Sequence, residues 1–127
     1  MDWGWYDSLT QSPLTPPQWV FGVVWPILYL TILISFVLFI QRDGLHQYLA
    51  LTCFIVQLVL NISWSLVFFN AKSVAGSLVI IVLLLVSIVA VMITFYKVHP
   101  VATYVLIPYA LWVGFATYLN VYIYVSL

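Results

Sequence analysis

The chain has 127 residues, of which 66% are hydrophobic and only 5% are charged, with three basic residues, three aspartates and no glutamate. A soluble domain carries roughly 25% charged residues, so this composition excludes a soluble globular protein and indicates an integral membrane protein. A net charge of zero excludes a basic surface for nucleic acid, and the single cysteine, Cys53, excludes an intramolecular disulfide.

Residues 1–18 differ from the rest of the chain because they contain no long apolar run. They hold three prolines and several aromatic residues, but no basic stretch followed by an apolar core, which a secretory signal peptide requires. The sequence therefore predicts a stiff, water-compatible segment in front of the membrane-spanning part.

Four later windows are long and apolar enough to cross a bilayer, which takes roughly 20 apolar residues in a helix. All six charged residues lie outside these windows or at their ends, as expected where lipid penalises charge. We therefore predict an all-α fold, a membrane bundle of four transmembrane helices in a single domain. The predicted helices cover residues 19–40, 46–69, 74–96 and 101–125.

The third window is almost purely aliphatic, whereas the other three carry amides, prolines and aromatic residues. We expect the third helix to face lipid over much of its circumference and the others to line the interior. Ser73 is a candidate N-cap for the third helix, and Pro100 can open the fourth.

Two prolines fall inside predicted helices, and each has a tryptophan close by: Trp25 precedes Pro26, and Trp112 follows Pro108 and Tyr109. A proline inside a helix removes a backbone hydrogen bond and bends the axis. Each pair could be a simple packing kink, or the two could form the walls of a pocket.

Amide side chains recur in the spans, with Gln57 and Asn61 four residues apart on one helix face and Asn120 on the fourth helix. Amides in lipid must find hydrogen-bond partners. They could join helices to one another, or Asn61 could present its amide to a ligand. Ala116, four residues after Trp112, could leave room for a flat group or allow close helix packing.

The sequence lacks the residue sets of most catalytic sites. Two isolated histidines without acidic or thiol companions do not predict a metal site. No span contains a carboxylate, and no Ser-His-Asp arrangement is present, so acid–base hydrolysis and proton transport through a buried acid are not predicted.

Four motifs, in order along the chain, strongly resemble the TspO/MBR family of tryptophan-rich sensory and translocator proteins. They are WYDSL at 5–9, TPPQWVFGVVW at 15–25, QLVLNISWSLVFF at 57–69 and PYALWVGFATYLN at 108–120. The resemblance implies a helical membrane bundle that binds porphyrins, either protoporphyrin IX or haem, as ligands rather than as an obligatory cofactor. It also implies a homodimer in contact with membrane lipid, and a role for residues 1–18 as a lid over the pocket.

The resemblance also implies roles for individual residues. Some bacterial members are reported to degrade protoporphyrin in light and oxygen, and the positions matching the two tryptophans concerned are Trp25 and Trp112. The ligand-binding residues that we predict on this basis are Tyr6, Trp25, Asn61, Tyr109, Trp112 and Ala116.

The sequence departs from the family pattern in three respects. The family has five helices, with the lid after the first, but this sequence begins at the lid, so we expect four. The lysine and aromatic residue of the usual lid motif are replaced at Gln11 and Leu14. No basic residue follows Tyr122, so sterol binding is not supported.

Two other functions stay open at this stage. Four helices are the size of a small-molecule membrane transporter, although the small multidrug exporters need a membrane glutamate that this chain lacks. A flank left open by the expected helix count could instead dock a larger membrane complex, which would make the protein a structural or assembly partner.

Overall fold

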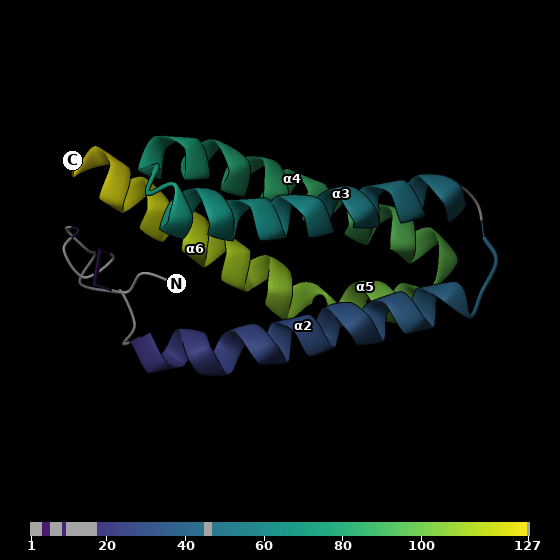
Figure 1. Ribbon diagram of the computed structural model, residues 1–127. Helices are drawn as coiled ribbons and strands as arrows, with labels where there is room; N and C mark the ends of the chain where they lie inside the picture. The colour runs from purple at the N-terminus through teal and green to yellow at the C-terminus, as the bar shows by residue number, and fades with distance from the viewer. Residues whose placement is uncertain (1–3, 6–8, 10–17, 45–46, 127) are drawn as a thin grey trace.

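The computed structural model describes residues 4–5, 9, 18–44 and 47–126 of the chain. Four helical spans lie side by side along one long axis (Figure 1). The C-terminal end of α6 lies at the same end of the bundle as the start of α2 (Figure 1). The elements are α2 (Gln18–Ile40), α3 (Gln47–Ser65), η1 (Leu66–Asn70), α4 (Val74–Val98), α5 (Pro100–Val105) and α6 (Ile107–Val125).

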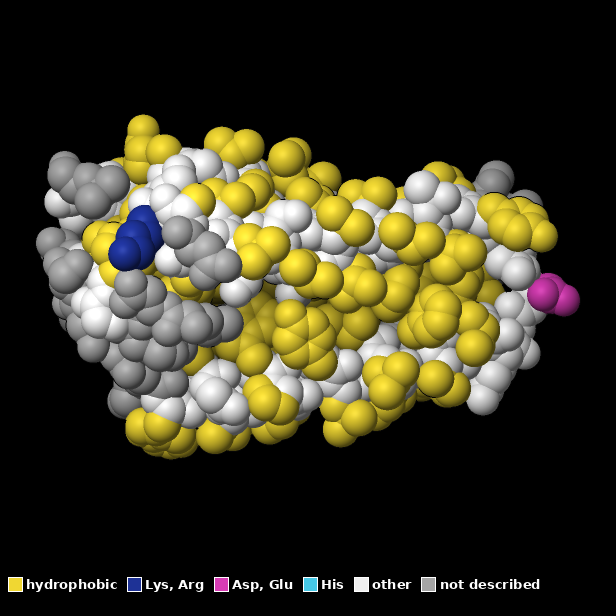
Figure 2. Space-filling view, viewed as in Figure 1, with side chains coloured by type: hydrophobic (Ala, Val, Ile, Leu, Met, Phe, Trp, Pro, Cys, Tyr) yellow, Lys and Arg dark blue, Asp and Glu magenta, His cyan; other side chains and the backbone are white. Residues whose placement is uncertain are grey.

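All four spans are long and apolar enough to cross a membrane, and they match the predicted windows to within two residues at each end. The charged side chains visible in Figure 2 lie at the two ends of the molecule, and hydrophobic side chains cover the face between them. The prediction of an integral, multi-pass, all-α membrane protein is therefore confirmed.

The helix ends follow from local chemistry. The Ser73 side chain accepts a hydrogen bond from the backbone N–H of Gly76 at 3.1 Å, so the predicted N-cap of α4 is confirmed. Pro100 stands in the first turn of α5, where its missing N–H costs nothing. The fourth span is divided at Leu106, two residues before Pro108. Pro108 has no N–H to bond the Tyr104 carbonyl four residues earlier, and its ring clashes with that carbonyl, so one continuous helix is disfavoured here.

The expected contrast between a lipid-facing third span and three spans that line the interior is not observed, although the larger part of the third span is not buried inside the bundle. Of the four spans, α4 has the largest buried share, 39%, compared with 22%, 22% and 33% for the others in chain order. It packs against α3 and α6 and also contacts α5. Aliphatic side chains suit a helix interface and a lipid surface equally well, so their presence alone could not distinguish the two environments.

Aromatic rings fill the end of the bundle that is distant from the start of α2. The Phe39 and Phe95 rings stack with centroids 4.2 Å apart, and the Phe36 and Phe54 rings stack at 4.8 Å. A hydrogen bond of 2.7 Å from Ser35 Oγ to the Ala102 carbonyl joins α2 to α5. These contacts hold α2, α3, α4 and α5 together at this end.

Gly44, in the turn after α2, is required by a close approach to the end of α4. A Cβ atom at this position would lie 2.9 Å from Val98 Cγ2 and 3.0 Å from Val98 Cα. The Cα atom belongs to the backbone and cannot rotate away, so an added methyl group must push the turn from α4.

We therefore expect Gly44→Ala to destabilise the protein by about 1–3 kcal/mol, the usual cost of overpacking, measured as a lower melting temperature in detergent. Gly114→Ala is the matched control, because its added Cβ meets no atom within 4 Å in the part of the chain that the structure describes and alanine favours a helix. Equal melting temperatures for the two variants would contradict this account of Gly44.

Candidate ligand-binding cavity

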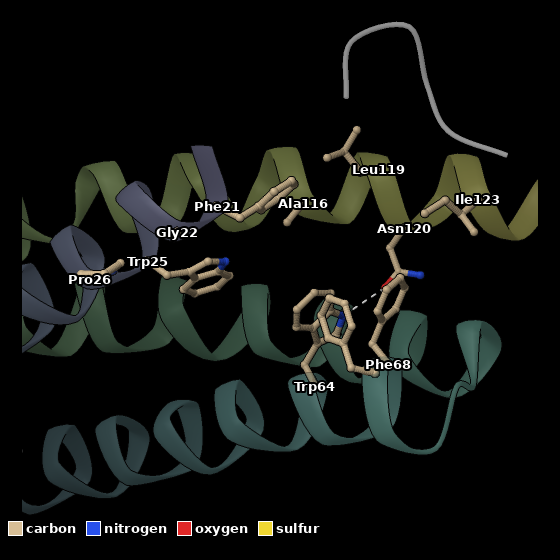
Figure 3. Close-up of a pocket in the computed structure, with 11 residues that line it drawn as sticks. Phe21, Gly22, Trp25, Pro26, Trp64, Phe68, Ala116, Leu119, Asn120 and Ile123 are labelled. Atoms are coloured by element: carbon tan, nitrogen blue, oxygen red, sulfur yellow. Dashed lines mark hydrogen bonds between the residues drawn. The ribbon is translucent and has the colours of Figure 1, made fainter. Parts of the chain in front are cut away.

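A cavity of about 310 Å³ lies between α2, α6 and the end of α3 with η1. This volume falls within the range of small-molecule sites, about 300–1,000 Å³. Figure 3 shows its walls, which come from three separate spans. The lining residues are Phe21, Gly22, Trp25, Pro26, Trp64, Phe68, Phe69, Ala116, Leu119, Asn120 and Ile123.

The α2 wall is formed by Phe21, Gly22, Trp25 and Pro26, whose spacing of one, three and one residues keeps them on one side of the helix. Pro26 has no N–H with which to bond the Gly22 carbonyl one turn earlier. Gly22 has no side chain, and no atom of the described residues lies within 4 Å of a Cβ built on it. The helix surface is therefore open between the Phe21 and Trp25 rings.

The opposite wall depends on a π-helical turn. After Trp64 the chain widens into η1, closed by a bond from Ala71 N–H to the Leu66 carbonyl, five residues back. Trp64 and Phe68 stack with centroids 5.2 Å apart, and Phe68 meets Phe69 edge to face at 4.9 Å. π-helical turns are rare in proteins as a whole, and those that do occur are often found at functional sites.

The α6 wall combines a small side chain with a polar one. Ala116 leaves space opposite the α2 aromatic rings, and Leu119 and Ile123 extend the apolar surface. Asn120 contributes an amide, whose Oδ1 accepts a hydrogen bond of 3.0 Å from Trp64 Nε1. Among the lining residues none is charged, so the cavity suits an apolar ligand surface.

Part of the predicted lid lies against this site. Trp5 meets Phe68 edge to face with centroids 5.2 Å apart, and Trp5 and Leu9 pack on the cluster around Phe68 and Ile123. Tyr6, the lid residue predicted to bind ligand, lies outside the described residues, as does most of the segment 1–18.

Two of the predicted ligand-binding residues, Trp25 and Ala116, line the cavity. Trp112 does not line it. The Trp112 ring instead packs edge to face on Phe21, which does, at 5.6 Å. Within the described part of the chain, the buried Trp112 Nε1 atom has no hydrogen-bond acceptor.

Asn61 and Tyr109 belong to a separate polar network. The Tyr29 hydroxyl donates to Asn61 Oδ1 at 2.6 Å, Asn61 Nδ2 donates to the Tyr109 hydroxyl at 2.8 Å, and that hydroxyl donates to Gln57 Oε1 at 2.9 Å. The network joins α2, α3 and α6 without lining the cavity. In this arrangement the Asn61 amide joins helices, which was one of its two interpretations.

Sequence reasoning did not select Trp64, Phe68, Phe21 or Asn120 as ligand contacts. Trp64 and Phe68 stand four residues apart, a spacing that could have placed both on one helix face. The π turn that brings Phe69 in beside them has no signal in the sequence. Among the described residues no group of histidine, cysteine or carboxylate side chains could hold a metal ion.

Tyr109→Phe tests the Asn61 network. Removal of the hydroxyl leaves Gln57 Oε1 without its donor and Asn61 Nδ2 without its acceptor, so we expect a loss of about 1 kcal/mol in the free energy of unfolding. Denaturation in detergent measures it. Tyr124→Phe, at an exposed position near the end of α6, is the control, and an equal effect of both variants would refute a stabilising role for the network.

Comparison with known proteins agrees with the motifs. The TspO/MBR family model matches residues 1–125. The chain is 38% identical to tryptophan-rich protein TspO of Chlorobaculum tepidum, over 91% of this chain and 74% of the relative. It is 33% identical to the translocator protein of Homo sapiens, over 91% of this chain and 70% of the relative. It is 33% identical to the tryptophan-rich sensory protein of Cereibacter sphaeroides, over 91% of this chain and 72% of the relative. The chain therefore belongs to the TspO/MBR family.

Proposed function

We propose that the protein binds porphyrin- or haem-type tetrapyrroles in this cavity and acts as a sensor, scavenger or regulator of tetrapyrrole metabolism. The observation that carries the proposal is a cavity whose described lining residues carry no charge and include indole and phenyl rings from separate spans. A tetrapyrrole is a flat macrocycle with apolar faces, which such walls can contact. Relatives named as a sensory protein and a translocator protein are consistent with a role in small-molecule recognition.

The energetics favour moderate affinity. An aromatic contact contributes about 0.5–1.5 kcal/mol beyond the burial of area. Several such contacts together with apolar burial reach about −8 kcal/mol, which corresponds to a micromolar dissociation constant. Because none of the described residues that line the cavity is cationic, the carboxylates of a porphyrin would have to stay at its water-facing end.

Gly22→Leu tests whether the ligand occupies this cavity. The added side chain projects from a lining position with open space around its Cβ, so it should fill the cavity without disturbing the fold. We expect protoporphyrin IX to bind at least about tenfold more weakly, a difference of roughly 1.4 kcal/mol, as measured by quenching of tryptophan fluorescence.

Gly114→Leu is the matched control for this experiment. Its Cβ also meets open space, but the residue does not line the cavity. Both variants should keep the wild-type melting temperature within a few degrees. Unchanged affinity in Gly22→Leu, or equal losses in the two variants, would place the porphyrin elsewhere.

A light-dependent activity can be tested with the same proteins. If an indole in contact with the porphyrin supports its oxidation by oxygen, Trp25→Phe should slow the light-dependent loss of porphyrin absorbance more than Trp112→Phe does, because Trp25 lines the cavity and Trp112 does not. Samples kept in the dark provide the baseline. Equal rates in the wild type and both variants would remove the photochemical role from these two residues.

A further inference from the structure

Asn120 joins three spans at one end of the cavity. Its Oδ1 atom accepts hydrogen bonds from Trp64 Nε1 at 3.0 Å and from Ser77 Oγ at 3.2 Å, and its Nδ2 atom donates to the Val74 carbonyl at 3.4 Å. The residue is 2% exposed. Its Oδ1 atom is therefore fully used by the protein, since an amide oxygen has two lone pairs.

The bond from Trp64 fixes the orientation of an indole that forms part of the cavity wall. An indole has a single polar group, the Nε1–H donor, and a membrane interior offers no water to satisfy it. Any rotation of the ring away from Asn120 would leave this donor unpaired. Figure 3 shows the Trp64 ring held by this bond, on a different helix from Trp25 and within the same cavity.

Stacking supports the same orientation from the other side. Trp64 lies nearly parallel to Phe68, with an angle of 19° between the ring planes, and Phe68 is itself 2% exposed and contacts Trp5 and Phe69. The indole is thus fixed at its edge by Asn120 and on its face by Phe68.

We propose that Asn120 is a positioning residue, which holds the Trp64 indole in the cavity wall and so sets ligand affinity through Trp64 rather than through its own contact with ligand. This inference rests on the proposed function for its effect on affinity, but the orientation of Trp64 can be tested without any ligand. If Asn120 only joined helices to one another, its replacement would lower stability without a specific effect on Trp64.

The ligand-free test is nuclear magnetic resonance of the indole ¹⁵N–¹H groups of the full chain in detergent micelles. Trp64→Phe identifies the Trp64 signal among the six tryptophans. In Asn120→Leu we expect the Trp64 proton signal to move upfield, because its acceptor is lost. Asn120→Asp keeps an Oδ1 acceptor, so in this variant the Trp64 proton signal should stay near its position in the wild type.

Ser77→Ala is the matched control, since it removes the other donor to Asn120 Oδ1 and should leave the Trp64 signal in place. An unmoved Trp64 signal in Asn120→Leu would overturn the proposal. If that variant does not fold, the wild type still decides: the Trp64 proton should resonate downfield of the Trp112 proton, whose nitrogen has no acceptor within the described residues, and the reverse order would overturn it.

A double-mutant cycle with protoporphyrin IX tests the effect on affinity. Asn120→Leu should weaken binding about tenfold in the wild-type background, roughly 1.4 kcal/mol by conversion, and by less than about twofold in the Trp64→Phe background. Equal losses in both backgrounds would show that Asn120 does not act through Trp64. If the wild type does not bind protoporphyrin IX at all, the proposed function fails, while the indole signals still decide the positioning of Trp64.

Discussion

Two buried asparagines, Asn61 and Asn120, satisfy the constraint on which the bundle depends, namely that lipid offers no hydrogen-bond partner to a polar group. Each amide bonds to groups of other spans: Asn61 to the side chains of Tyr29 and Tyr109, and Asn120 to the side chains of Trp64 and Ser77 and to the backbone of α4. Because an amide left unpaired in this environment is costly, these bonds select one arrangement of helices among the many that apolar packing would allow.

The two networks have different consequences for function. The Asn61 network lies in the helix interface, where it joins α2 to α3 and α6 without touching the cavity. The Asn120 network includes two residues of the cavity wall itself, Asn120 and Trp64. One amide therefore contributes to stability, and the other also fixes the shape of the surface that a ligand would meet.

The cavity exists because several local departures from regular helix coincide in space. In α2, Gly22 leaves the helix surface open and Pro26 removes one backbone hydrogen bond. The π turn of η1 turns Phe68 and Phe69 toward the cavity, and in α6 the small side chain of Ala116 leaves space. At the other end of the bundle, where such departures are not combined, stacked phenylalanine rings fill the interior. Aromatic side chains thus fill the interior at one end of the bundle and form the walls of a cavity at the other.

The sequence by itself determined the class of the protein, the four spans and the cap at Ser73, because length, hydropathy and capping are local properties. The motifs and the proline beside Trp25 also led to the prediction of Trp25 and Ala116 as ligand-binding residues, and both line the cavity. Only the tertiary structure decided that α4 is the most buried span, that Asn61 bonds to tyrosines, and that Trp64 shares the cavity with Trp25. These outcomes depend on the rotation of each helix about its axis and on which helices become its neighbours. Aliphatic and aromatic side chains suit lipid and protein equally well, so the local sequence does not encode the rotation or the neighbours.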